Sequence, residues 1–239
     1  MSDELLKRLS KKLQVHIGSS PREIIGTKKV ESIRLDDQAY PVDAVLFMTG
    51  VQPHVELAKS MGLQIGDLGG VKVSNLLETS VHDVYSVGDC IEMFDRLTGR
   101  PVIMPIGSVA ARAGRQAGVA AVGGTKVYDD VSIRFQYDRI FDTDIVCVGH
   151  SSVIANSLGV KTNVHYLEDN VEYSKVALVT KEDGTIIGGQ VIAPRMGARI
   201  GYQIHQRVEK GAKIINAPLL EPLHKRMHDL LEETLGPIQ

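Results

Sequence analysis

The stretch Thr79-Ser-Val-His-Asp-Val-Tyr-Ser-Val-Gly-Asp-Cys90 decides how the rest of the chain is interpreted. Val84–Val87 is typical of a short strand, which Gly88-Asp89 ends abruptly. A buried strand of this kind carries a carboxylate to the edge of a sheet, and glycine lets a ligand approach the backbone closely. Asp89 could accept hydrogen bonds from ligand hydroxyls or hold a phosphate through water. An ordinary turn also ends many strands in this way. The neighbouring segments must therefore decide whether this stretch is a ligand site or a simple turn.

Downstream, Ser108–Val122 predicts a helix rich in Ala and Gly, with Ser108 as its N-cap. Small residues let a helix pack closely against a sheet or a flat ligand. The N-terminus of a helix has unpaired N–H groups and roughly half a positive charge, which suits an anionic acceptor. An Ala-rich core helix without a ligand is the alternative.

Upstream, Ala44–Met48 is apolar throughout, which predicts a strand buried on both faces. Thr49-Gly50 ends this strand, and an ordinary glycine turn would explain the pattern equally well. The other elements expected in this part are helices over Asp3–Leu13 and Val55–Met61 and strands over Val15–Ile17 and Lys29–Leu35.

A different layer is expected after Gly123-Gly124, which is the natural linker. Strands are predicted over Ser132–Asp138, Asp144–Ser151, Lys161–Glu168, Ser174–Thr180 and Thr185–Ala193, with a hairpin turn at Lys181–Gly184. Helices over Arg195–Lys210 and Leu219–Leu235 follow, so this part is an α+β layer.

These motifs together resemble the flavoproteins with two dinucleotide-binding domains. Thr79 to Asp89 resembles their second flavin-binding motif, and Asp43–His54 resembles the end of their NAD domain. Residues 176–192 resemble the dimerisation domain of flavin-dependent disulfide reductases. The chain thus resembles a C-terminal portion of an FAD-dependent pyridine nucleotide-disulfide oxidoreductase of the NADH oxidase and coenzyme A disulfide reductase branch.

The resemblance implies an α/β part and an α+β part. Residues 1–124 would be the C-terminal part of the Rossmann-like NAD(P)- and FAD-binding domains, and residues 125–239 the dimerisation domain. Electrons would pass from NAD(P)H through FAD to oxygen or to a disulfide or persulfide. Homodimerisation through residues 125–239 is implied as well.

The resemblance also implies which residues contact the cofactor. Thr49 and Gly50 would form the turn that leads from the NAD domain back to the FAD domain. Gly88 and Asp89 would lie at the ribityl and phosphate part of FAD. Ile106, Gly107 and Ser108 would lie near the isoalloxazine ring, with the helix end facing the negative charge of the reduced flavin.

Several motifs of the full-length family are missing from this sequence. It has neither glycine fingerprint, for FAD or for NAD(P)H, and it lacks the redox cysteine. A truncated form, a split subunit completed by a separate N-terminal half, and a fragment all remain open. The chain alone is not expected to retain FAD, and the competing hypothesis is a non-catalytic dimerisation or interaction module.

A further candidate site lies near the C-terminus. By resemblance, His224 and Asp229 would be an acid–base pair that protonates a thiolate, although Lys225 stands where the family has Pro. His224 and His228 on a solvated helix face are the simpler interpretation. A metal site built from these two histidines and Glu232 would lack the usual glutamate, so no metal is expected.

Composition narrows the remaining classes. The chain has 239 residues, 43% hydrophobic and 23% charged, with a formal net charge of −2. Nothing in this balance points to nucleic acid or a membrane surface. Cys90 and Cys147 make neither a disulfide framework nor a metal cluster, and the charged N-terminal residues do not resemble a signal peptide, so a cytoplasmic protein is expected.

Overall fold

The computed structural model describes residues 1–128, 131–169, 173–214, 231, 232 and 234. The chain forms two compact units, Ser2–Val51 and Gln52–Gln239, and Met1 is grouped with the second. The predicted division at residue 124 falls inside the second unit and stays a prediction. Among the described residues, no helix combines the length and the apolar character needed to cross a bilayer.

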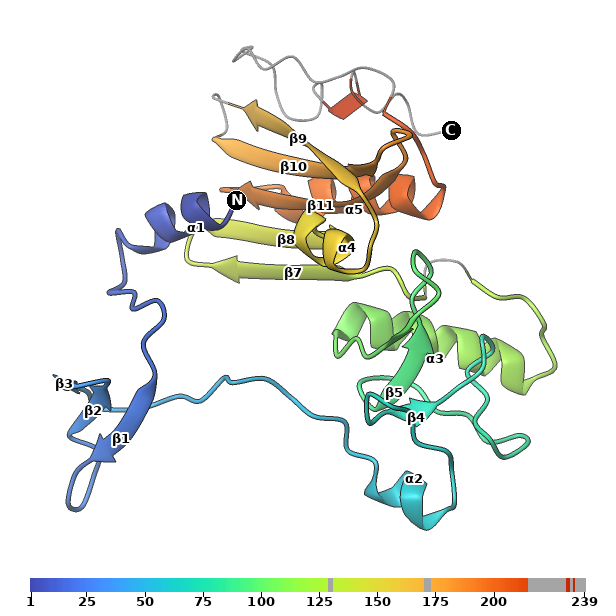
Figure 1. Cartoon of the computed structure of the whole chain (residues 1–239), viewed down its shortest axis with the longest axis horizontal. Helices are drawn as coiled ribbons and strands as arrows, with labels where there is room; N and C mark the ends of the chain where they lie inside the picture. Colours follow the sequence, from blue (N-terminus) through green and yellow to red (C-terminus); the bar gives the residue numbers. More distant parts are fainter. Residues whose placement is uncertain (129–130, 170–172, 215–230, 233, 235–239) are drawn as a thin grey trace. The chain divides into compact units, whose positions relative to one another are not determined.

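The first unit contains a short helix and a small antiparallel sheet (Figure 1). Its elements are α1 (Ser2–Leu9), β1 (Pro21–Ile25), β2 (Ser32–Leu35) and β3 (Gln38–Pro41). Acidic residues begin α1 and basic residues end it, which complements the helix dipole. The helix ends four residues earlier than predicted. The strand predicted over Val15–Ile17 is wrong, because Ile17 is 73% exposed and these residues pair with no described strand.

The segment Asp43–Val51 of the first unit is irregular, and the buried strand predicted over Ala44–Met48 is wrong. Leu46 is 87% exposed and Met48 is 91% exposed. A strand that is buried on both faces needs neighbouring strands and a covering layer on each side. The described residues supply neither, so the apolar side chains lie open to solvent.

The second unit begins with α2 (Glu56–Ser60), β4 (Val71–Lys72), β5 (Ile91–Phe94), β6 (Pro101–Val102) and α3 (Gly107–Ala121). β5 lies between β4, which is parallel to it, and β6, which is antiparallel. The core packs one face of α3, including Val109 and Ala113, with Leu77 and Ile91. The strand predicted over Val84–Val87 is reduced to one bridge between Glu78 and Tyr85.

The rest of the second unit is a five-stranded antiparallel sheet in the order β7-β8-β11-β10-β9. The strands are β7 (Phe135–Ile140), β8 (Thr143–Gly149), β9 (Thr162–Asp169), β10 (Ser174–Lys181) and β11 (Ile186–Ala193), and the helices are α4 (Ser152–Ser157) and α5 (Gly197–Glu209). The five predicted strands and the helix over Arg195–Lys210 are confirmed with small shifts in their ends. Of the helix predicted over Leu219–Leu235, only Leu231, Glu232 and Thr234 are described, and they are helical.

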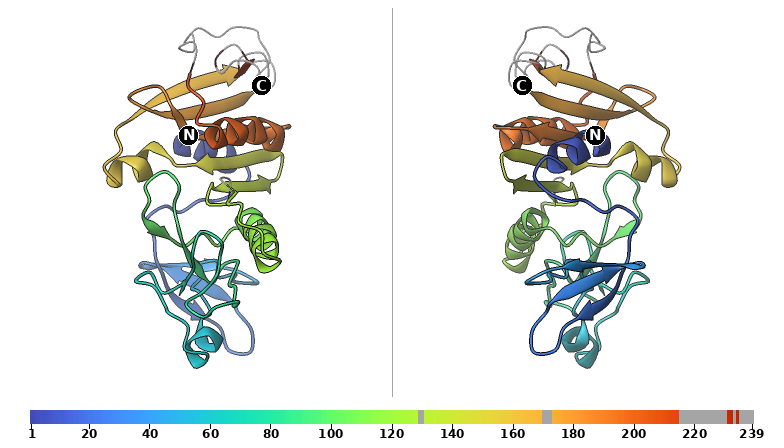
Figure 2. Two further views of the ribbon diagram at one scale, coloured as in Figure 1. Left: turned by 90° about the vertical axis from the view of Figure 1, so that its right-hand side faces the viewer. Right: turned by 90° about the vertical axis from the view of Figure 1, so that its left-hand side faces the viewer.

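The two faces of this sheet are covered by different helices (Figure 2). Ile200 and Ile204 of α5 pack in a core with Val176, Leu178 and Val191. On the opposite face, Ala155 of α4 packs against Val179 and Ile187. Because side chains alternate between the two faces of a strand, one sheet serves both cores.

Side-chain hydrogen bonds fix α3 to the start of this sheet. Ser108 Oγ donates to the carbonyl of Phe135 at 2.5 Å, and the Arg112 guanidinium donates to the carbonyl of Ile133. Gln116, which is fully buried, joins the helix to the carbonyl of Lys126 and the N–H of Tyr128. Any ligand at the N-terminus of α3 therefore meets a helix held in place by the sheet.

Candidate functional site

The segment Thr79–Ile91 is shaped by hydrogen bonds within it and to its neighbours. The N–H of Thr79 donates to the carbonyl of Val84 at 2.8 Å, and the N–H of Ser86 donates to the carbonyl of Leu77 at 3.1 Å. The N–H of Ile91 then reaches back to the carbonyl of Gly88 at 3.4 Å and closes a turn that leads directly into β5.

Gly88 occupies this turn with a φ of +87°, in the left-handed region that favours glycine. A Cβ built on Gly88 would lie 4.0 Å from the Cβ of Ala110, which is ordinary contact. The backbone conformation, rather than crowding by the protein, therefore explains why glycine stands here. The same distance shows that the turn lies beside the first turn of α3.

Asp89 follows in the turn with an exposed side chain. Within the described part of the chain, its carboxylate has no hydrogen-bond or ion-pair partner. Cys90 behind it is held at the surface of the core, with Sγ 3.5 Å from the carbonyl of Val87 and 3.7 Å from Ser86 Oγ. The side chain of Asp89 is thus accessible to a ligand, whereas the side chain of Cys90 contacts other residues of the turn.

The N-terminus of α3 differs from the predicted one. Ile106 is the N-cap residue, in an extended conformation, and no side chain caps the helix. Ser108, predicted as the cap, lies inside the helix and donates to Phe135 instead. Gly107 is exposed, and no atom lies within 4 Å of a Cβ built on it. The N–H groups of the first turn of α3 therefore have no side-chain cap, and there is open space beside Gly107.

This arrangement fits one part of a flavin. The turn that carries the exposed Asp89 lies beside the first turn of α3, whose N-terminus is uncapped. A carboxylate suits ligand hydroxyls, and a helix N-terminus suits an anionic ring edge. The structure places the Gly88-Asp89 turn beside the first turn of α3, which begins at Gly107 and includes Ser108, with Ile106 as its N-cap residue. The two units are not positioned relative to each other, so Thr49 and Gly50 are described only by themselves. Both are exposed, and Gly50 has a φ of +101°.

Other predicted residues have separate outcomes. His224 and Asp229 lie outside the described residues. Cys147 is half-buried in β8, where burial raises the pKa of its thiol. Glu78, His82 and Asp83 group ligand atoms within 4.8 Å of one another, but two of the three are exposed and His82 already pairs with Glu78 at 2.9 Å. We assign no metal to this group.

Sequence analysis missed a buried polar pair in the second unit. His150, which follows β8, places Nε2 2.9 Å from Oδ2 of Asp95, which follows β5. The N–H and the hydroxyl of Thr98 both donate to Oδ1 of Asp95 at 2.8 Å. Burial raises the pKa of the Asp95 carboxyl, but the hydrogen bonds from His150 and Thr98 outweigh it and lower the pKa below its ordinary value.

Comparison with known proteins supports the interpretation of the motifs. The family model "Pyridine nucleotide-disulphide oxidoreductase" matches residues 1–117. The NADH oxidase of Methanocaldococcus jannaschii is 30% identical over 214 residues, which are 85% of this chain and 46% of that protein. The CoA-dependent NAD(P)H sulfur oxidoreductase of Pyrococcus furiosus is 26% identical over 226 residues, or 91% of this chain and 49% of that protein.

Two solved structures that are similar to this chain come from the same kinds of enzyme as these sequence relatives. The NAD-dependent persulfide reductase from A. fulgidus has a TM-score of 0.77 at 25% identity, covering 86% of this chain and 40% of that one. The water-forming NADH oxidase from Lactobacillus brevis shares the fold, with a TM-score of 0.75 at 17% identity over 93% of this chain and 51% of that one. The chain spans about half the length of the curated relatives that it matches. By sequence over residues 1–117 and by fold, the chain is similar to the pyridine nucleotide-disulphide oxidoreductases.

Proposed function

We propose that the protein to which this chain belongs passes electrons from NAD(P)H through FAD to oxygen or to a disulfide or persulfide. The relatives named NADH oxidase, NAD(P)H sulfur oxidoreductase and persulfide reductase support this range of acceptors. FAD, when bound, would supply the redox chemistry, and the protein would bind and orient it.

One observation carries the proposal. The Gly88-Asp89 turn and the uncapped N-terminus of α3 lie side by side, although 17 residues separate Asp89 from Gly107 in the sequence. Asp89 would accept hydrogen bonds from the ribityl and phosphate part of FAD. The N–H groups at Ile106, Gly107 and Ser108 would face the ring edge, where the positive end of the helix dipole favours the negative charge of reduced flavin.

The remaining roles are part of the same proposal. Thr49-Gly50 would connect the NAD domain to the FAD domain, and His224 with Asp229 would protonate a thiolate product. Two copies would pair through residues 125–239, in the cytoplasm. We also propose that Leu46 and Met48 are covered in the complete protein by a segment that carries the first FAD motif and the NAD motif, in the same chain or in a separate one. The exposure of both side chains supports this.

The test is the visible absorption spectrum of the purified chain with added FAD, alone and after coexpression with the N-terminal half of the M. jannaschii NADH oxidase. We expect flavin bands at about one FAD per chain only in the complemented sample. Asp89→Ala should weaken FAD binding by about tenfold, which corresponds to roughly 1.4 kcal/mol. Asp37→Ala, in the turn between β2 and β3, is the matched control and should have no effect.

Two outcomes would contradict the proposal. If Asp89→Ala left the affinity for FAD unchanged, Asp89 would not be part of the flavin site. If no combination retained flavin while the chain still dimerised, the competing hypothesis of a non-catalytic dimerisation module would be favoured.

A further inference from the structure

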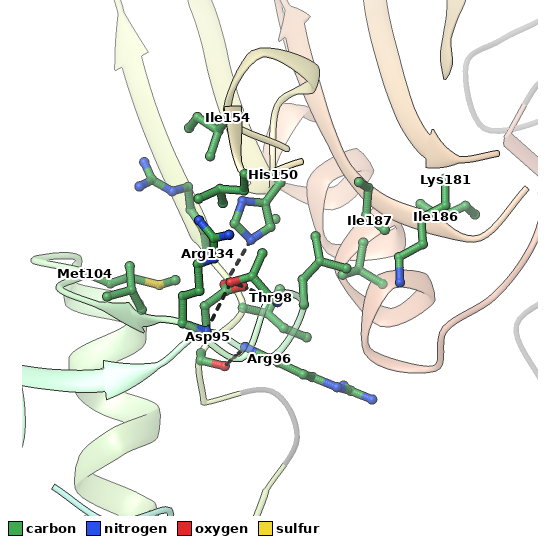
Figure 3. A pocket seen from close by; sticks show the side chains of 18 of the residues that line it. Asp95, Arg96, Thr98, Met104, Arg134, His150, Ile154, Lys181, Ile186 and Ile187 are labelled. Atoms are coloured by element: carbon green, nitrogen blue, oxygen red, sulfur yellow. Dashed lines mark hydrogen bonds and ion pairs between the residues drawn. The ribbon is translucent and has the colours of Figure 1, made fainter. Parts of the chain in front are cut away.

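A cavity of about 440 Å³ lies in the second unit between the β5–β6 hairpin, the entry to β7, α4 and the end of α5 (Figure 3). None of the residues proposed to contact FAD lines it. Its volume falls within the range of small-molecule sites, which are mostly apolar with a few well-placed polar groups. The cavity therefore needs an explanation of its own.

The wall of the cavity is largely apolar and comes from several elements. Met104, Ile133, Ile186 and Ile187 are buried residues of this wall, and Ile154 on α4 is 41% exposed at its edge. Because the wall combines the hairpin with the sheet and its helices, it depends on the packing of the whole second unit. An apolar body would gain free energy by leaving water for this space.

The polar groups of the cavity have a fixed geometry. Figure 3 shows His150 and Asp95 facing each other, with Thr98 beside them. The hydrogen bonds to Asp95 favour its ionised form, so His150 donates through Nε2 and keeps Nδ1 as its second polar atom. The carboxylate of Asp95 therefore already accepts hydrogen bonds from His150 and Thr98.

The cationic side chains give the cavity its charge. Asp95 is the single acidic residue that lines the cavity. Four lining residues are cationic: Arg96, Arg100, Arg134 and Lys181. Arg134 and Lys181 are half-buried, from the entry to β7 and the end of β10. These positive charges would repel a cationic ligand. They favour an anionic head group, because a charge-assisted hydrogen bond is stronger than a neutral one.

We propose that this cavity binds a small organic anion with an apolar body and one carboxylate, of the medium-chain fatty acid class. The positive charges of Arg134 and Lys181, which lie on different walls of the cavity in Figure 3, would favour the carboxylate, and the apolar body would fill the space lined by Met104, Ile133 and Ile187. The site is separate from the proposed flavin site, so either can fail without the other.

The experiment is isothermal titration of the full chain with decanoate, below its micelle concentration, and with decan-1-ol, which has the same chain length without the charge. We expect one decanoate per chain and at least tenfold weaker binding of decan-1-ol. Inorganic phosphate should not compete with decanoate. Equal binding of decanoate and decan-1-ol, or competition by phosphate at the decanoate concentration, would overturn the proposal.

Variants locate the binding in this cavity. Arg134→Gln and Lys181→Gln should each weaken decanoate binding about tenfold. Lys161→Gln, whose side chain is 82% exposed and does not line the cavity, should leave it unchanged. Equal effects of all three would mean that decanoate responds only to net charge, and the site assignment would fail.

A filling substitution tests the apolar body by a different route. Ile154→Trp places a larger ring at the edge of the cavity from an exposed position, so the fold should be retained, as judged by an unchanged far-UV circular dichroism spectrum. Decanoate binding should be lost. Val153→Trp, at a 77% exposed neighbour that does not line the cavity, is the control. Undiminished binding to Ile154→Trp would place decanoate elsewhere.

Discussion

Gly88 links a backbone conformation to the candidate cofactor site. Because its φ of +87° disfavours any residue with a Cβ, Gly88→Ala should cost roughly 1–2 kcal/mol of the free energy of unfolding. The new methyl group would meet only ordinary contact with Ala110, so crowding adds little. Urea unfolding of the chain measures this cost.

The control for that prediction comes from another glycine of the same region. Gly114 lies inside α3, has no positive φ, and leaves open space around a built Cβ. Gly114→Ala should therefore stabilise the chain by about 1 kcal/mol, the helix-propensity difference between the two residues. Two changes of the same sign would contradict the conformational argument.

Asp95 makes a prediction about pH at the same scale. Its pKa is lower in the folded state than its ordinary value of 3.8, so its contribution to stability is present above that pH and is lost as the pH falls through the folded pKa. Asp95→Asn should destabilise the chain by about 1–3 kcal/mol at pH 7 and by less at pH 3. Urea unfolding at both pH values checks this, with Asp138→Asn, an exposed carboxyl on β7, as the control. A difference that stayed constant with pH would mean that the carboxyl charge plays no part.

Elements whose signals are local could be predicted from the sequence. Lys181–Gly184 marked the β10–β11 hairpin, and the spacing of Ile200 and Ile204 marked α5, because both depend on residues close in the chain. Ala44–Met48 and Val84–Val87 were wrong as strands because pairing depends on segments far away. An apolar run indicates that a segment is suited to burial, but it does not show that other segments are present to bury it.

The β10–β11 hairpin carries a measurable pKa. Asp183 accepts from the N–H and the hydroxyl of Thr185 at 3.0 and 2.9 Å and pairs with Lys213 at 3.1 Å. The N–H of Thr185 is the largest cause that holds the pKa of Asp183 at about 2. The hairpin therefore loses this stabilisation as the pH falls from 3.8 towards about 2.

Thr185→Val removes the hydroxyl donor and keeps the N–H, so the pKa of Asp183 should rise towards 3.8 without reaching it. Carboxyl-carbon NMR shifts across the acid range measure the change. Thr162→Val is the matched control, because the hydroxyl of Thr162 donates to Asn156 rather than to a carboxylate. If the pKa of Asp183 did not move, the hydroxyl of Thr185 would contribute nothing to it, and the N–H of Thr185 together with Lys213 would account for the low value.

At the scale of the whole molecule, the sequence predicted only part of the candidate site. The order of Gly88-Asp89 and the Ala-rich helix was enough to expect them together, and the second unit brings them together. Asp95 and His150 were missed because they are 55 positions apart in the sequence and neither lies in a motif. Thr49 and Gly50 lie in the other unit, so their place in a site depends on how the units join.

The exposed segment Leu46–Val51 gives the prediction that concerns the complete protein. Leu46 contributes little to this chain by itself, since it is 87% exposed, so Leu46→Asp should change the free energy of unfolding by less than about 0.5 kcal/mol. In the complemented flavoprotein the same residue would be covered, and a buried unpaired carboxylate would be strongly unfavourable.

Leu46→Asp should therefore abolish flavin retention in the complemented sample while leaving the isolated chain folded. Leu57→Asp is the control, because Leu57 is 74% exposed on α2, outside the segment. Retention of flavin by Leu46→Asp would show that the segment stays open in the complete protein. Its apolar residues would then need another partner, because exposed apolar patches of this kind usually mark interaction surfaces.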